Sequence, residues 1–127
     1  MLQISFQPCL VVPGRSSISV TGLHGTEGWA APEVFTRDVK SVTYAVDIFS
    51  LGCVFYFILS GGKHPYGAEF FMRQARIRQS RHELEDLEPV QEELITRMIR
   101  PDAKARIVTF NAYVPTNNLT FNLDCRR

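Results

Sequence analysis

One apolar run limits the fold of this chain more than any other feature. Residues 46–59 form a stretch of fourteen, in which Asp47 and Ser50 are the strongly polar positions. A helix that spans a membrane needs about twenty apolar residues, so the run predicts a helix buried in protein. Its apolar side chains cover nearly every face, which is typical of a helix surrounded on all sides. The Gly61-Gly62 pair would end it.

Further helices are expected downstream and just upstream of this run. Residues 31–35 predict a short helical turn, and residues 69–80 predict a second helix. A third would begin at Pro89, which suits the first helical position, and its apolar stripe ends near residue 100. A wrapped helix needs neighbours on every side, and only two long ones are evident. The sequence therefore predicts a mainly α, incomplete domain that is part of a larger core.

The two ends of the chain carry weaker signals. Residues 9–12 and 18–21 lean towards β structure, and residues 14–28 contain four glycines and several hydroxyl side chains, which predict a long flexible loop. Residues 107–127 are rich in Asn and Thr, show no clear period, and are expected to be irregular. No linker divides the chain into two domains.

Composition excludes several classes of function. With 14 basic and 13 acidic side chains the net charge is +1, so a strongly basic nucleic-acid binder is excluded. The three cysteines show no C-x-x-C spacing and favour reduced intracellular thiols, and the three histidines lack metal-ligand spacing. The basic residues 73–81 could contact RNA or acidic protein, although a solvated helix face is favoured. We expect a cytosolic segment without membrane or nucleic-acid contact.

An ordered series of motifs carries the functional signal. Gly25-Thr26-Glu27-Gly28-Trp29-Ala30-Ala31-Pro32-Glu33 is followed by Asp47-Ile48-Phe49-Ser50-Leu51-Gly52, then His64-Pro65-Tyr66-Gly67, and finally Arg106. The series resembles the second half of a eukaryotic Ser/Thr protein kinase domain. Within kinases it is most similar to the inositol-requiring kinase/endoribonuclease, the endoplasmic-reticulum stress sensor of the unfolded protein response. The resemblance covers residues 14–107 and leaves 1–13 and 108–127 unmatched.

The resemblance implies scaffold roles for three charged residues. Glu33 would pair with Arg106 and clamp the activation segment to the helical lobe, because a guanidinium forks onto a carboxylate. Asp47 would accept hydrogen bonds from the backbone of the catalytic loop, since a buried charge is costly without donors. The alternatives are two unrelated surface charges for the pair, and for Asp47 an acid favoured by the start of its helix.

The same resemblance implies a substrate pocket and a phosphorylated loop. Thr26 would line the pocket beside the phosphoacceptor, with Trp29 packed against it, although a plain core tryptophan is an equal alternative. The loop hydroxyls that stand where this family is phosphorylated are Ser16, Ser17, Ser19 and Thr21. Phosphate there could order the loop by pairing with arginines. Without that context they are simply a hydroxyl-rich loop.

The groups that perform phosphoryl transfer are missing. The sequence contains no G-x-G-x-x-G, H-R-D or D-F-G, which in kinases hold ATP, supply the catalytic base and bind magnesium. The resemblance therefore implies ATP and magnesium for the complete family domain, and no cofactor, metal site, catalytic residue or independent activity for this chain. The alternative is a non-catalytic interaction module that docks on a full-length relative, on another protein or on itself. In the full-length protein the segment would lie on the cytosolic face of the endoplasmic reticulum.

Overall fold

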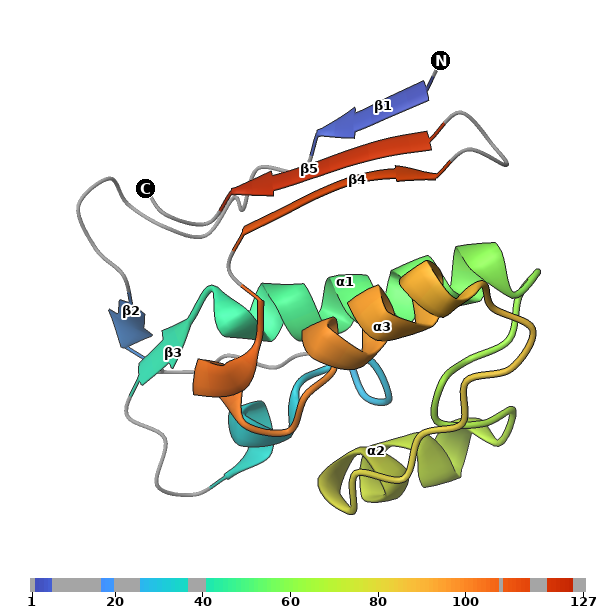
Figure 1. Ribbon diagram of the computed structural model, residues 1–127. Coiled ribbons are helices and arrows are strands. Elements are labelled where there is room, and N and C mark those ends of the chain that lie inside the picture. The colour runs from blue at the N-terminus through green and yellow to red at the C-terminus, as the bar shows by residue number, and fades with distance from the viewer. Residues whose placement is uncertain are drawn as a thin grey trace.

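The computed structural model describes residues 2–5, 17–19, 26–36, 41–107, 109–114 and 119–124. Within these residues three α-helices form the centre of the fold: α1 (Ala45–Leu59), α2 (Phe70–Arg78) and α3 (Pro89–Met98). Short 3-10 helices cover Pro32–Phe35 and Ala103–Ala105. In Figure 1, α1 and α3 run side by side and α2 lies below them. All three predicted helices and the predicted turn are confirmed, and so is the mainly helical fold class.

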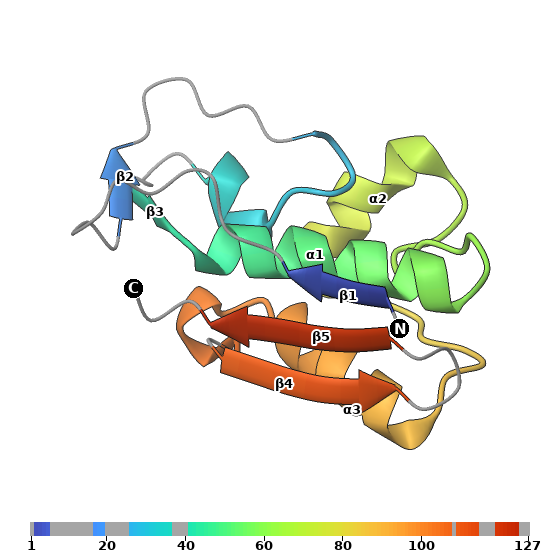
Figure 2. The same cartoon turned by 90° about the horizontal axis from the view of Figure 1, so that it is seen from above.

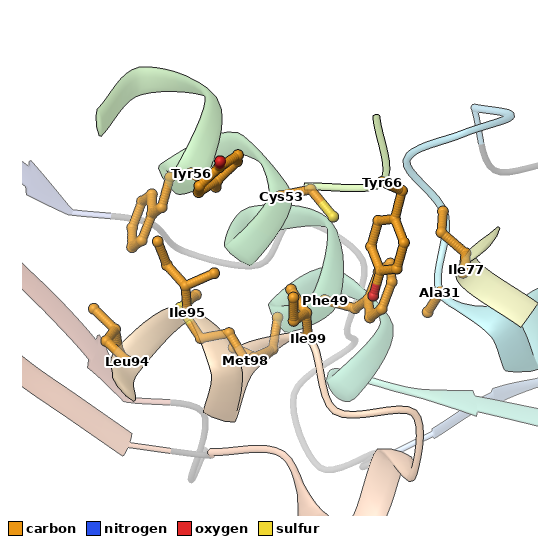
Figure 3. Packing of buried hydrophobic residues seen from close by; sticks show 12 residues of the cluster. Ala31, Phe49, Cys53, Tyr56, Tyr66, Ile77, Leu94, Ile95, Met98 and Ile99 are labelled. Carbon is orange, nitrogen blue, oxygen red and sulfur yellow. The ribbon is translucent and has the colours of Figure 1, made fainter. Parts of the chain in front are cut away.

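The hydrophobic core lies between α1 and α3. Phe49, Cys53 and Tyr56 of α1 and Ile95 and Met98 of α3 belong to one cluster of buried side chains, which Figure 3 shows from close by. All five of these side chains are buried. Tyr66, from the loop after α1, and Ile77 of α2 extend the core towards the second helix. The apolar run of the sequence thus forms the element around which the other helices pack.

Gly52 sets how closely α1 and α3 approach. A Cβ at this position would lie 2.8 Å from Cβ of Met98 and 2.8 Å from Cγ2 of Ile99. Carbon atoms normally separate by about 3.5–4.0 Å. A side chain at Gly52 would therefore push the two helices apart.

The expectation that α1 is wrapped on all sides is met only in part. Val54, Phe57 and Ile58 are 39%, 42% and 53% exposed. Apolar residues on several faces did predict a surrounded helix, but the described residues cover one side of its C-terminal half only. The exposure of these three side chains agrees with the sequence prediction that the core is incomplete.

A small sheet lies beside the helices. It contains β1 (Leu2–Ser5), β5 (Leu119–Asp124) and β4 (Thr109–Val114) in the order β1-β5-β4. β5 is antiparallel to β4 and parallel to β1. Figures 1 and 2 place this sheet over α1 and α3, on the side away from α2.

The prediction that residues 107–127 are irregular is therefore wrong for most of that segment. The missed signal is the alternation of Leu119, Phe121 and Leu123 with Thr120, Asn122 and Asp124, which has the period of a strand. Hydrogen bonds to distant β1 and to β4 complete the strand, and a local reading of Asn- and Thr-rich sequence does not include them.

A second pair of strands joins the N-terminal region to the start of α1. β2 (Ser17–Ser19) is antiparallel to β3 (Ser41–Thr43). β2 lies inside the predicted loop 14–28 and overlaps the β-leaning residues 18–21, whereas residues 9–12 fall outside the described residues. In the part of the chain that is described, no helix has the length and apolar content needed to cross a membrane.

Candidate functional site

Glu33 and Arg106 form a two-pronged ion pair across 73 residues of sequence. Nη1 of Arg106 donates to Oε1 of Glu33 at 2.5 Å, and Nη2 donates to Oε2 at 2.9 Å. Glu33 belongs to the 3-10 helix Pro32–Phe35, and Arg106 follows the 3-10 helix Ala103–Ala105. The ion pair expected from the sequence is confirmed, and the reading of two unrelated surface charges is wrong.

Arg106 uses every donor of its guanidinium. Besides Glu33, its nitrogens donate to the carbonyl oxygens of Arg100 (2.6 Å), Ala45 (2.8 Å) and Pro101 (3.2 Å). A guanidinium carries five N–H donors, so all five are satisfied. The guanidinium also lies 5.0 Å from the centre of the Phe49 ring. Since the Arg106 side chain is fully buried, this residue ties Glu33, the start of α1 and the end of α3 together.

A tight turn leads from Thr26 into the residues before Glu33. The amides of Trp29 and Ala30 donate to the carbonyl oxygen of Thr26 at 3.0 and 3.2 Å. Thr26 and Glu27 are exposed, whereas Gly28, Ala30 and Ala31 are buried. We call residues 26–31 the anchored turn. It presents the Thr26 side chain to solvent from a base fixed in the core.

Side chains from α1 and α2 hold the backbone of the anchored turn. The Ser50 hydroxyl of α1 donates to the Trp29 carbonyl at 2.9 Å. The Gln74 side chain of α2 accepts from the Gly28 amide at 2.9 Å and donates to the Ala30 carbonyl at 3.5 Å. The turn is thus fixed to two helices.

The Trp29 ring packs in an aromatic corner. It meets His64 edge to face, with ring centres 4.4 Å apart, and Phe57 at 5.9 Å. Burial, assisted by the positive charge of Arg73 and partly opposed by the Gly28 backbone, lowers the pKa of His64 to about 4. His64 is therefore neutral near pH 7. Its Nδ1 accepts from the Tyr66 amide at 3.1 Å, which places the proton on Nε2.

Asp47 lies at the start of α1, close to the residues that Arg106 holds. It lies in the first turn of α1, two residues after Ala45. Burial raises the pKa of the Asp47 carboxyl, and among the described residues no hydrogen bond or ion pair reaches its oxygens. The predicted bonds to a catalytic loop remain a prediction, because this chain lacks the H-R-D sequence that marks such a loop.

The other predicted residues are placed as follows. Ser17 and Ser19 lie in β2, while Ser16 and Thr21 fall outside the described residues. Among the described residues no three His, Cys, Asp or Glu side chains gather as metal ligands. Burial raises the pKa of the Cys53 thiol to about 12, so this thiol is not a nucleophile.

Sequence reasoning missed the contributions of Gln74 and His64. Gln74 shares a helix face with Phe70 and Ile77, which are spaced four and three residues from it. The available signal was the polar side-chain amide of Gln74, which by its spacing from Phe70 and Ile77 falls on the apolar face of the helix. His64 stood in the quoted His64–Gly67 motif, but nothing local indicated that it would pack on Trp29.

Comparisons with known proteins agree with the motif series. Residues 10–115 match the protein kinase domain family, a range slightly wider at both ends than the 14–107 inferred from the motifs. Two relatives named serine/threonine-protein kinase/endoribonuclease are 53% identical: ire-1 of Caenorhabditis elegans over 70 residues and IRE2 of Homo sapiens over 75. IRE1b of Arabidopsis thaliana is 40% identical over 89 residues.

These relatives are much longer than the chain. The aligned parts cover 53%, 57% and 68% of this chain but only 7%, 8% and 10% of the respective relatives. The family match over residues 10–115 includes the anchored turn, α1 and Arg106. On the matched range, the chain belongs to the protein kinase domain family and is similar to its Ser/Thr kinase/endoribonucleases.

Proposed function

We propose that this chain carries the substrate-binding turn and helical scaffold of a Ser/Thr protein kinase of the unfolded-protein-response type, and none of the groups that transfer phosphate. The observation that carries the proposal is the buried Arg106–Glu33 pair. Through Glu33, the pair holds the residues that directly follow the anchored turn against the helices. This is the role that the family resemblance implies for a clamp between the activation segment and the helical lobe. The relatives' names supply the reaction class, phosphoryl transfer to Ser or Thr.

The anchored turn suits recognition of a protein segment. Thr26 is exposed while Gly28 and Ala30, two and four residues later, are buried and hydrogen bonded to Gln74. A hydroxyl held by a rigid base can bind a peptide without a large ordering cost. We assign Thr26 to contact with the substrate, Trp29 to the wall of the pocket, and Glu33 and Arg106 to the support beneath it.

The residues present do not fit ATP or magnesium. No carboxylate cluster for a metal occurs among the described residues, and the Gly-rich, H-R-D and D-F-G sequences are missing from the chain. The Asp47 carboxylate has no hydrogen-bond or ion-pair partner among the described residues and is partly desolvated, which supports a scaffold role in which backbone donors of another kinase segment complete it. The proposed contribution of this chain is thus binding and support, without chemistry.

A chimera tests this proposal. Residues 14–107 of this chain would replace the aligned segment of the nematode ire-1 kinase, and phosphorylation of a Ser/Thr peptide would be measured. We expect activity, with a large loss on Glu33→Ala and a rise in the KM for peptide on Thr26→Ala. Lys63→Ala is the matched control, since Lys63 pairs only with exposed Glu85 and Asp86. A chimera that binds ATP but phosphorylates nothing would contradict the proposal.

A second candidate is a non-catalytic module that docks on a full-length kinase relative or on another copy of this chain. The exposed Val54, Phe57 and Ile58 side chains of α1 favour it, because apolar patches at a surface mark interaction sites. Sedimentation of the chain, alone and mixed with the relative, tests it. Binding that Ile58→Glu abolishes would support this function, and a monomer that ignores the relative would oppose it.

Phosphorylation in trans is a separate proposal. Ser16, Ser17, Ser19 and Thr21 are the proposed acceptors, because a substrate needs only an accessible hydroxyl. Incubation of the chain with an active relative, ATP and magnesium, followed by mass spectrometry, should place phosphate on these four residues. Phosphate found only elsewhere would contradict this assignment.

A further inference from the structure

We propose that Gln74 is a positioning residue, whose side-chain amide fixes the backbone of the anchored turn to α2. That this turn binds protein substrate rests on the proposed function; the anchoring itself does not. Gln74 is 6% exposed and lies 46 residues from Gly28 in sequence. No motif of the sequence series includes it.

The contact uses both ends of the Gln74 side-chain amide. Oε1 of Gln74 accepts from the Gly28 amide at 2.9 Å, and Nε2 donates to the Ala30 carbonyl at 3.5 Å. A primary amide offers a donor and an acceptor together. It can therefore accept from the N–H of one residue of the turn and donate to the C=O of another at the same time.

The turn has the backbone shape that this contact needs. Gly28 has φ +83°, and a Cβ on it would lie 3.3 Å from both Cβ and Cδ of Arg73. Glycine is the residue that accepts both the left-handed conformation and the close approach. The backbone thus comes close enough to α2 for Gln74 to reach it.

Among the described residues, the Gly28 amide donates to Gln74 and to no other acceptor. The Ser50 hydroxyl donates to the carbonyl oxygens of Trp29 and Val46, and the Thr26 carbonyl accepts from Trp29 and Ala30. Gly28 is buried, so without Gln74 its N–H would be shielded from water and unsatisfied. An unsatisfied buried donor is costly, and the turn would open or shift to reach water. Such a shift would also displace Thr26, which lies exposed at the start of the turn.

Hydrogen exchange of the Gly28 amide, followed by NMR on the full chain, tests the proposal. We expect Gln74→Leu to speed this exchange about tenfold relative to wild type. The Cys53 amide in the middle of α1 reports on global unfolding, and its exchange should change less. Gln79→Leu is the matched control, because Gln79 is an exposed glutamine at the end of the same helix. It should leave Gly28 unchanged.

The conservative variant Gln74→Glu adds a measurement that would not change with pH if Gln74 only packed against the turn. Burial raises the pKa of a carboxyl, and the protonated form can both accept from the Gly28 amide and donate to the Ala30 carbonyl. The ionised form can only accept, is repelled by the Ala30 carbonyl and is costly to bury, so we expect it to turn to solvent and leave the Gly28 amide. Protection of Gly28 should therefore be lost near pH 7 and return towards the wild-type value as pH falls through that pKa. Each measurement is compared with wild type at the same pH, which cancels other titrating groups.

The outcomes separate this proposal from the proposed function. Equal Gly28 exchange in Gln74→Leu and Gln79→Leu, or a Gln74→Glu variant whose protection does not respond to pH, overturns the anchoring. If Gln74→Leu does not fold, the pH response of Gln74→Glu decides. None of these measurements needs kinase activity, so an inactive chimera would overturn the proposed function and leave the anchoring standing.

Discussion

The buried Arg106–Glu33 pair permits a quantitative prediction. Glu33→Ala removes two of the five acceptors of a guanidinium that is fully buried. The charge remains, with three carbonyl oxygens and no counter-ion. Breaking a buried pair in this way costs about 3–5 kcal/mol. For a domain of this size that loss lowers the Tm by about 10 °C or more.

A double-mutant cycle separates the pair from its surroundings. Arg106→Met removes the charge and all five bonds, but Glu33, whose side chain is 22% exposed, can turn to water. The double variant leaves neither charge buried. It should therefore be more stable than the sum of the single losses predicts, with a coupling energy of about 2–3 kcal/mol.

Urea unfolding followed by far-UV circular dichroism measures all four proteins of the cycle. Lys63→Ala is the control for a surface pair, since Lys63 and its partners Glu85 and Asp86 are at least half exposed. Its effect should be small and should fade in high salt, whereas the Arg106–Glu33 coupling should persist. A coupling energy below about 0.5 kcal/mol, the scatter expected for independent sites, would refute the argument that this pair clamps the fold.

Three further predictions follow from the same contacts. Burial lowers the pKa of His64 to about 4 from 6.5, so the contribution of His64 to the free energy of unfolding should be fully present above pH 6.5. It should fall by up to about 3 kcal/mol as the pH drops from 6.5 to 4. In urea titrations at several pH values, His64→Gln should show a weaker pH dependence than wild type. Gly52→Ala should cost about 1–3 kcal/mol by overpacking against Met98 and Ile99, seen as a lower urea midpoint. The purified chain should transfer no phosphate from labelled ATP with magnesium; incorporation above a protein-free control that Asp47→Ala abolishes would contradict this.

The sequence predicts the helices because their signals are local. The apolar run, Pro89 at the start of α3 and the paired glycines after α1 each specify structure within a few residues. The Glu33–Arg106 pair was found through the order of motifs, since 73 residues separate its members. That order carries information that composition and periodicity do not.

The role of Gln74 could not be predicted in the same way. A glutamine is neutral and common on helix surfaces, and its function here arises only from the turn that packs on it. β5 was missed for a related reason, because its alternation is short and one of its two partner strands, β1, lies far away in the sequence. Features that depend on distant partners need the structure.

The parallel pairing of β1 with β5 has a consequence for the order of folding. It sets Leu2 opposite Leu119, so nearly the whole chain lies between two paired residues. Closing so long a loop is entropically costly, and contacts of this kind form slowly. During synthesis β1 must wait until β5 leaves the ribosome, while α1 and α3 can already associate. β1 would spend that interval as an open strand edge, the period in which a newly made chain is most exposed to wrong pairing.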